Sequence, residues 1–229
     1  MWTFSSKGSL RLQIDLIKRH LFACHDLRQR GLSIADVLTS QKCALEQISS
    51  DESQHFPEDD VLDSSSGAQY FLHRHESDLL GNTIHIHFFK RWKPKELHLK
   101  KHETITTHLV ALALDSQGHP SQWFTVNQWV VGDYWQPADE TVELFRNWKV
   151  SKPDDGRGDD VQRVGHEWLS TLIALHLDGD IKELLDERDA RLDKLVDANP
   201  QINALNDRSI EVFGSRAFCE CANHLTQKE

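Results

Sequence analysis

The sequence has few cysteines, no long apolar run and no excess of basic residues, and each of these absences excludes a class of protein. Its four cysteines, Cys24, Cys43, Cys219 and Cys221, are too few and too unevenly spaced for the disulfide framework of a small secreted protein. No apolar run approaches the roughly 20 residues that a membrane span needs. The N-terminus lacks the uninterrupted apolar segment and the small-residue cleavage site of a signal peptide, so we expect a cytoplasmic protein.

The charge balance narrows the choice of partner. The formal net charge is -10 at pH 7. Nucleic-acid backbones and anionic membrane surfaces repel so acidic a chain, so neither is an expected partner, and the residues do not identify a small molecule or a protein in their place. The length of 229 residues suits one domain. We predict a single α+β domain over 1–229, with N-terminal helices over 1–50, a sheet core over 68–150 and C-terminal helices over 159–218.

Hydrophobic periodicity indicates the order of the elements. Helices are expected over residues 9–30 and from Ser33 to about residue 48, and the acidic, serine-rich stretch 49–67 is expected to be a loop. Two hairpins follow, one over 70–89 and one from strands at 108–115 and 122–131. The remaining helices begin at Pro137 and after the linker 151–160, and end near Phe218. This pattern predicts a four-stranded antiparallel sheet with two N-terminal helices and a C-terminal helical set packed on it.

Two His-x-His pairs, His73/His75 and His85/His87, flank a turn candidate at residues 78–82. Successive side chains of a strand alternate between faces, so each pair places both imidazoles on one side. A five-residue loop would pair His75 with His85 and His73 with His87, and all four histidines would share one face. His108 begins the next expected strand and is a fifth candidate, because strands adjacent in sequence are usually adjacent in space.

Imidazoles that converge from neighbouring strands predict a metal site. Opposed Cβ atoms lie roughly 4.5–5.5 Å apart, and a neutral imidazole is a good ligand for Zn, Fe or Cu. We therefore expect a metal-binding protein, and if it is an enzyme, an open coordination position would activate water or dioxygen with Glu76 as the nearest base. Asn127 is a polar residue between Trp123 and Trp129 on one face of an expected strand, so Asn127, Trp129 and Trp135 are expected to line a cofactor pocket.

Alternatives to a metal centre stay open. One is a non-catalytic interaction or accessory protein whose histidines are structural, and another is a haem or organic-cofactor pocket with a histidine as axial ligand. A phosphoryl-transfer role for His85 or His87 and a soft-metal clip formed by Cys219, Cys221 and His224 are weaker signals.

The segment from about Tyr70 to Trp148 resembles a family of small bacterial proteins of unknown function. The likeness consists of the histidine-rich hairpin, a strand that begins His-Leu-Val, a Phe-Thr-x-Asn-x-Trp-Val segment and a Gly-x-x-Trp step into a helix. The matching positions here are His73, His75, His85, His87, His108, Phe124, Thr125, Asn127, Trp129, Val130, Gly132 and Trp135. The resemblance implies a common fold and a site built from these residues, and it implies no reaction.

Overall fold

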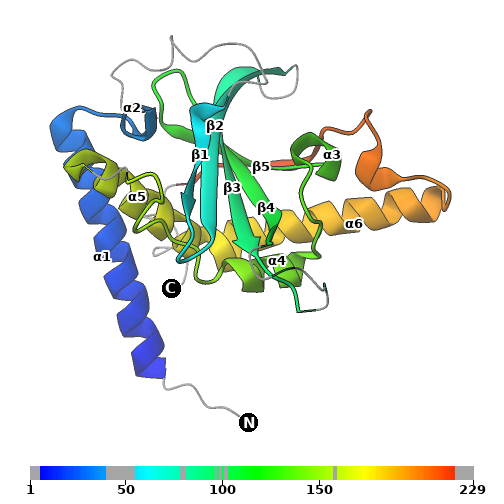
Figure 1. Ribbon diagram of the computed structural model, residues 1–229, viewed down its shortest axis with the longest axis horizontal. Helices are drawn as coiled ribbons and strands as arrows, with labels where there is room; N and C mark the ends of the chain where they lie inside the picture. Colours follow the sequence, from blue (N-terminus) through cyan, green and yellow to red (C-terminus); the bar gives the residue numbers. More distant parts are fainter. Residues whose placement is uncertain are drawn as a thin grey trace.

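An antiparallel sheet of six strands, ordered β1-β2-β3-β4-β5-β6, is the centre of the fold (Figure 1). The computed structural model describes residues 6–39, 55–77, 81–95, 97, 100, 103–156 and 159–219, with the side chains of 6–9 and 75–82 excepted. The strands are β1 (Phe56–Asp63), β2 (Ala68–Ser77), β3 (Gly81–Trp92), β4 (Ile105–Leu114), β5 (Pro120–Val126) and β6 (Val212–Ala217). The helices are α1 (Ser6–Arg30), α2 (Ile34–Thr39), α3 (Gln128–Val131), α4 (Ala138–Phe145), α5 (Asp160–His176), η2 (Leu177–Ile181), α6 (Lys182–Ala198) and η3 (Ala204–Asn206).

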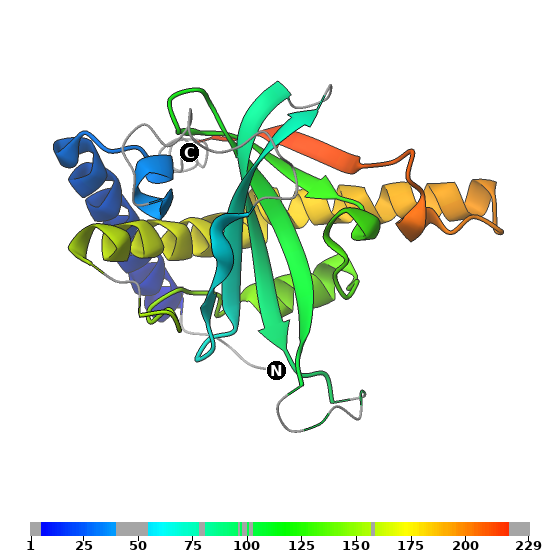
Figure 2. The same cartoon turned by 45° about the horizontal axis from the view of Figure 1, so that its top comes forward.

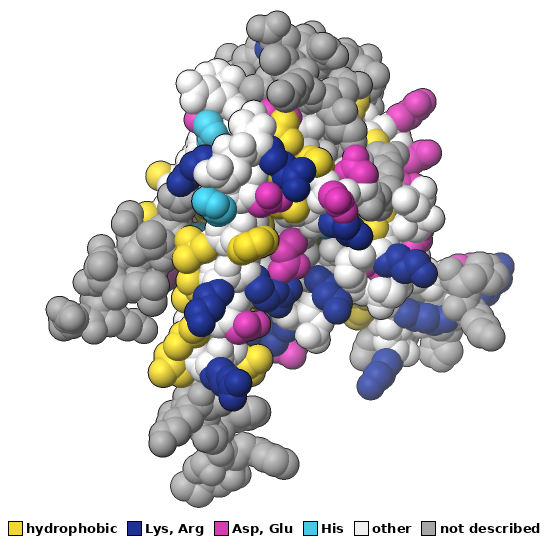
Figure 3. Space-filling view, turned by 90° about the vertical axis from the view of Figure 1, so that its left-hand side faces the viewer, with side chains coloured by type: hydrophobic (Ala, Val, Ile, Leu, Met, Phe, Trp, Pro, Cys, Tyr) yellow, Lys and Arg dark blue, Asp and Glu magenta, His cyan; other side chains and the backbone are white. Residues whose placement is uncertain are grey.

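Helices α5 and α6 cross one face of the sheet (Figure 2). The two helices follow one another end to end, and the π-helical turn η2 connects them. A kink lies within η2 at Gly179, whose backbone angles, φ -120° and ψ -112°, are not helical. The main core lies between these helices and the even-numbered residues of β2 and β3, for example Leu72, Ile86 and Phe88. Helix α1 packs on α5, forms the outer surface on that side (Figure 3), and extends at its N-terminal end past the sheet (Figure 1).

The expectation of four strands is wrong, because the sheet has six. The stretch 56–63, expected to be a loop, is strand β1 and pairs with β2. β1 is an edge strand whose exposed positions include Glu58 and Asp59, while Val61 and Asp63 are buried. Charged residues on an edge strand prevent pairing with other chains. These charged residues also interrupt the alternation of apolar and polar residues by which a strand is recognised. The sequence of this segment therefore resembles an exposed, charged loop.

The second additional strand lies near the C-terminal end, where a short helix to about Phe218 was expected. β6 pairs with β5 and places Gly214 opposite Thr125. A Cβ atom at Gly214 would stand 3.3 Å from the Leu184 side chain of α6, so a larger residue there would require that side chain to shift slightly. Glycine and serine weaken the strand pattern in the sequence, so the partner strand and α6 decide this conformation.

The β2–β3 register differs by two residues from the expected one. His73 lies opposite His85, and His75 lies opposite Thr83. Ser77 pairs with Gly81, so the connection is shorter than the five-residue loop that was expected. Because side chains alternate with a period of two, a shift of two residues leaves every side chain on its expected face.

Gly67, in the turn between β1 and β2, is a position where we expect alanine to be strongly destabilising. Its φ is +72°, and an added Cβ would collide with the backbone carbonyl of Arg91, a rigid neighbour. Gly156 has a similar φ of +73° but nothing within 4 Å of an added Cβ, so it is the matched control. We expect Gly156→Ala to lower the free energy of unfolding by about 1–2 kcal/mol and Gly67→Ala by about 3 kcal/mol or more in urea titrations. Equal losses would contradict the steric argument.

Among the described helices, none has both the length and the apolar character that crossing a lipid bilayer requires.

Candidate metal centre

Three histidines from the adjacent strands β2 and β3 meet on one face of the sheet. His73 lies directly opposite His85, and His87 lies opposite Phe71, the neighbour of His73 on the same face. The histidines lie on the face of the sheet that is turned away from α5 and α6. The residues that alternate with them along β2 and β3, such as Leu72 and Ile86, point to the other face and into the main core. The sequence therefore folds one side of the hairpin into the core and gathers imidazoles on the other.

The three imidazoles are close enough to share one ion. The Nε2 atoms of His73 and His87 lie 3.0 Å apart, and one nitrogen from each of His73, His85 and His87 lies within 4.8 Å of the others. Two nitrogens bound to one tetrahedral zinc ion at 2.0–2.1 Å would stand roughly 3.3 Å apart. The exposed fractions of His73, His85 and His87 are 9%, 2% and 2%. The donor set therefore fits a buried transition-metal ion after small adjustments.

His108, on β4, supports His87 from behind. Its Nε2 lies 3.2 Å from Nδ1 of His87, the nitrogen that faces away from His73. A register shift between His87 and Phe89 brings His108 opposite Phe89 and so beside the His87 ring. Metal-bound histidines normally hold a hydrogen-bond partner on their second nitrogen, which fixes the tautomer that binds the ion. His108 occupies that supporting position.

Neighbouring side chains hold the rings in place and exclude water. The hydroxyl of Thr83 lies 2.6 Å from Nε2 of His85, and the Phe124 ring packs edge-on against His85 at 4.8 Å. Phe71 stacks on His87 with ring centroids 5.2 Å apart. The imidazoles thus lie among aromatic walls of low polarity, where an ion–ligand interaction is strong.

Burial favours the uncharged form of His87 and of His108. It lowers the pKa of His87 well below its ordinary value, and the nearby His73 and His108 lower that pKa further. Burial and the positive charge of Arg188 lower the pKa of His108 to about 3. A neutral imidazole is the form that coordinates a metal.

A pocket of about 330 Å³ reaches His73 and His87 from outside, and its other lining residues include His55, Asp60 and Asp133. The His55 ring stacks on Phe71 at 3.7 Å, and its Nδ1 lies 2.9 Å from the carboxylate of Asp60. Sequence reasoning missed His55 and Asp60 because they belong to the segment taken for a loop. These two residues could have been found in the sequence only if 56–63 had been recognised as a strand that pairs with the strand of His73.

Asp133 is a further pocket residue that sequence reasoning missed. Its carboxylate accepts a hydrogen bond of 2.8 Å from the backbone N–H of His108. Burial raises the pKa of Asp133 to about 6, against the opposing effects of that hydrogen bond and of Arg188. A carboxyl group with such a pKa can hold or release a proton near neutral pH.

Other residues expected at the site lie elsewhere or beyond what can be described. The side chains of His75 and Glu76 lie outside the described residues, as do Cys221 and His224 of the C-terminal clip. Asn127 caps α3 and donates a hydrogen bond of 2.9 Å to the carbonyl of Ala204. Trp129 Nε1 donates to the carbonyl of Ile210 at 2.9 Å. Both therefore contact the segment after α6.

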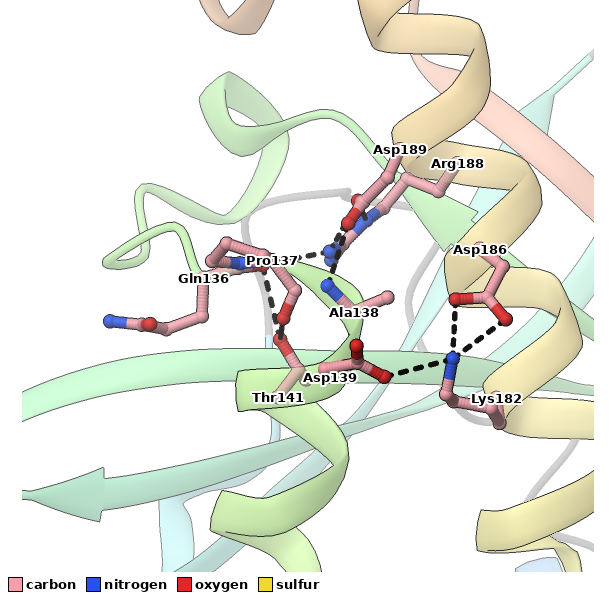
Figure 4. A network of polar contacts seen from close by, with 9 residues as sticks. All are labelled: Gln136, Pro137, Ala138, Asp139, Thr141, Lys182, Asp186, Arg188 and Asp189. Carbon is pink, nitrogen blue, oxygen red and sulfur yellow. Dashed lines mark hydrogen bonds and ion pairs between the residues drawn. The ribbon is translucent and has the colours of Figure 1, made fainter.

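Trp135 lies beneath a guanidinium group. The Arg188 guanidinium stands 4.0 Å above its ring and donates a hydrogen bond of 2.8 Å to the carbonyl of Gln136. Asp189 binds Arg188 and also accepts a hydrogen bond of 2.6 Å from the backbone N–H of Ala138 at the start of α4 (Figure 4). This network joins α4 to α6, and the assignment of Asn127, Trp129 and Trp135 to a cofactor pocket stays a prediction.

Comparison with known proteins gives one match. A family model described as "Domain of unknown function (DUF6969)" matches residues 18–218. The match spans most of the chain and agrees with the expected resemblance to a family of unknown function, while the histidine hairpin is not part of that description. Neither a curated protein nor a solved structure matches the chain.

Proposed function

The chain belongs to the DUF6969 family, a domain of unknown function, and we propose that it binds one divalent transition metal ion through His73, His85 and His87. The observation that supports the proposal most is the convergence of three buried imidazoles, with two Nε2 atoms 3.0 Å apart. Two imidazole nitrogens this close can share only one proton, and each neutral imidazole offers a lone pair that can bind a metal. Coordination to one ion would engage all three rings at once.

The surroundings favour a site with an open position over a closed structural one. Structural zinc ions have four protein ligands, whereas catalytic ions have three and leave one position to water or substrate. The pocket reaches His73 and His87, so a small molecule would approach the ion from that side. A bound Zn, Fe or Cu ion would supply Lewis acidity there. Asp133 lines the same pocket and would hold or move a proton, and the His55–Asp60 pair lies on the pocket wall with it.

Elemental analysis tests the proposal directly. We expect the purified protein, after treatment with a chelator and titration with Zn²⁺, to retain one ion per chain through gel filtration. Co²⁺ in the same site would give visible absorption bands typical of nitrogen ligands in tetrahedral geometry. A chain that retains no ion under these conditions would contradict the proposal and favour an accessory protein with structural histidines. An absorption band of haem in the protein as purified would favour the organic-cofactor alternative.

A further inference from the structure

Helix α1 exposes large apolar side chains along its length. The exposed fractions are 59% for Leu10, 43% for Ile14, 56% for Leu21, 74% for Leu12 and 74% for Phe22. Figure 3 shows apolar side chains and basic side chains side by side on this surface. Single exposed leucines are ordinary, but a gathering of them on one helix marks an interaction surface.

Three of these residues, together with the half-buried Ile17, form a narrow stripe. Leu10, Ile14, Ile17 and Leu21 are separated by four, three and four residues, which is the spacing of the a and d positions of a coiled coil. At 3.6 residues per turn, Leu12 lies on nearly the opposite side of the helix. We call Leu10, Ile14, Ile17 and Leu21 the α1 stripe.

The α1 stripe is not the face by which α1 joins the fold. Among the described side chains of α1, those of residues 10–30, the buried ones are His20, Ala23 and Leu27. His20 contacts α5 through Thr171, with 2.9 Å between Nδ1 and the hydroxyl oxygen. The α1 stripe is turned away from these residues around the helix. The family match begins at residue 18, so most of the α1 stripe precedes the matched region.

The charge around the α1 stripe is positive. Lys and Arg outnumber Asp and Glu by six to two in α1, in a chain of net charge -10. Arg19 and Arg30 form ion pairs with Glu167 and Asp26. Arg11, Lys18 and Arg28 have no ion pair within the part of the chain that the structure describes. Arg11 and Lys18 each follow a stripe residue, in the e positions whose charge selects the partner of a coiled coil.

We propose that the α1 stripe binds an acidic amphipathic α-helix of a partner protein. The a and d spacing of the α1 stripe is that of the seam of a helix pair, and Leu12 and Phe22 do not widen it, because they lie apart from the stripe at f and b positions. Two copies of α1 would bring together flanks that carry no opposite charges, so a second copy lacks the charge complementarity that an acidic helix supplies. Glutamate side chains on the partner would pair with Arg11 and Lys18.

A binding measurement with a synthetic helix tests this proposal. The probe is a fluorescein-labelled peptide of roughly three heptads, with leucine at a and d and glutamate at e and g. Fluorescence anisotropy is expected to show saturable binding by the whole protein. Leu21→Ser is expected to weaken binding roughly tenfold or more, because a buried leucine contributes more than the 1.4 kcal/mol that corresponds to this factor. Lys18→Glu is expected to weaken binding and to reduce its dependence on salt.

Leu12→Ser is the matched control, because Leu12 is exposed, apolar and on the same helix but outside the α1 stripe. It is expected to bind the peptide like the wild-type protein. Absence of binding, or an equal loss with Leu12→Ser, would overturn the proposal. A wild-type dimer in sedimentation that Leu21→Ser dissociates would assign the α1 stripe to a second copy instead. Binding to phosphatidylserine vesicles that Leu21→Ser abolishes would assign it to a lipid surface, and either result would overturn the acidic-helix partner.

Discussion

Replacement of His87 by alanine is expected to lower the affinity for Zn²⁺ by at least about a hundredfold, the largest effect of any single substitution at the site. His87 is central because its Nε2 faces His73 and its Nδ1 faces His108. Removal of its ring takes away one ligand and the contact that orients the cluster. The affinity can be measured by competition with a chromophoric chelator.

The same substitution is expected to abolish the stabilisation that, on this proposal, Zn²⁺ gives the wild-type protein. A ligand at a hundred times its Kd stabilises the folded state by about 2.7 kcal/mol. This gain would be seen as a higher Tm with Zn²⁺ than with a chelator, and in His87→Ala the two values of Tm should coincide.

Two further variants separate coordination from general damage to the fold. His108→Gln removes the group behind His87 but no ligand, so we expect an intermediate loss of affinity, about tenfold. His25→Ala changes an exposed histidine of α1 and should leave the affinity unchanged. If His87→Ala folds in the chelator and binds Zn²⁺ as tightly as the wild-type protein, the proposed ligand set is wrong.

Replacement of Asp63 by alanine is expected to lower the free energy of unfolding by about 3 kcal/mol or more. Asp63 ends β1, has an exposed fraction of 0%, and accepts hydrogen bonds of 2.8 Å from the backbone N–H groups of Ser151 and Lys152. Ser65 donates a third bond of 3.0 Å from its backbone. Alanine would remove the buried acceptor that these three backbone donors share, and urea unfolding would measure the loss.

The effect of Asp63→Ala should depend on pH. Burial alone would raise the pKa of Asp63, but the hydrogen bonds from Ser65, Lys152 and Ser151 outweigh burial and hold the pKa well below its usual range. A carboxyl group whose pKa is lower in the folded state stabilises the protein above its unfolded pKa of about 3.9, and this stabilisation is lost as the pH falls. The difference in unfolding free energy between wild type and Asp63→Ala should therefore be largest near neutral pH and shrink below about pH 4.

Asp154 supplies the control for this prediction. It lies in the same linker and accepts a hydrogen bond of 2.9 Å from the backbone of Ser64, but it is exposed. Water can replace an exposed acceptor, so Asp154→Ala should change stability far less. Similar losses for Asp63→Ala and Asp154→Ala would show that the buried carboxylate is not what joins the linker to β1.

The sequence predicts the face shared by His73, His85 and His87 because that inference needs only the two-residue period of a strand. This prediction of a shared face is confirmed, although the expected register between the two strands was wrong by two residues. The α+β class is likewise confirmed, because the long helical stretches have clear periodicity. His108 was expected beside the hairpin on the ground of sequence order, and β4 does pair with β3.

The rest could not be predicted, because it depends on contacts between segments far apart in the sequence. Asp60 has the look of solvated charge until β1 is placed beside β2, where its carboxylate meets His55 and Gln69. Asp133 follows a glycine in an apparent turn, and only the fold brings it to the backbone of His108. In both cases the function of a carboxylate is decided by a neighbour that local patterns do not identify.

The order of the strands has a consequence for the newly made chain. Strands β1 to β5 follow one another in sequence, whereas β6 joins β5 only after α5 and α6 have been synthesised. The residues of the histidine cluster are therefore all synthesised before β6, and until β6 is made β5 has no partner on its outer side. During this interval the unpaired β5 edge exposes the chain to aggregation, which ends when β6 pairs with β5.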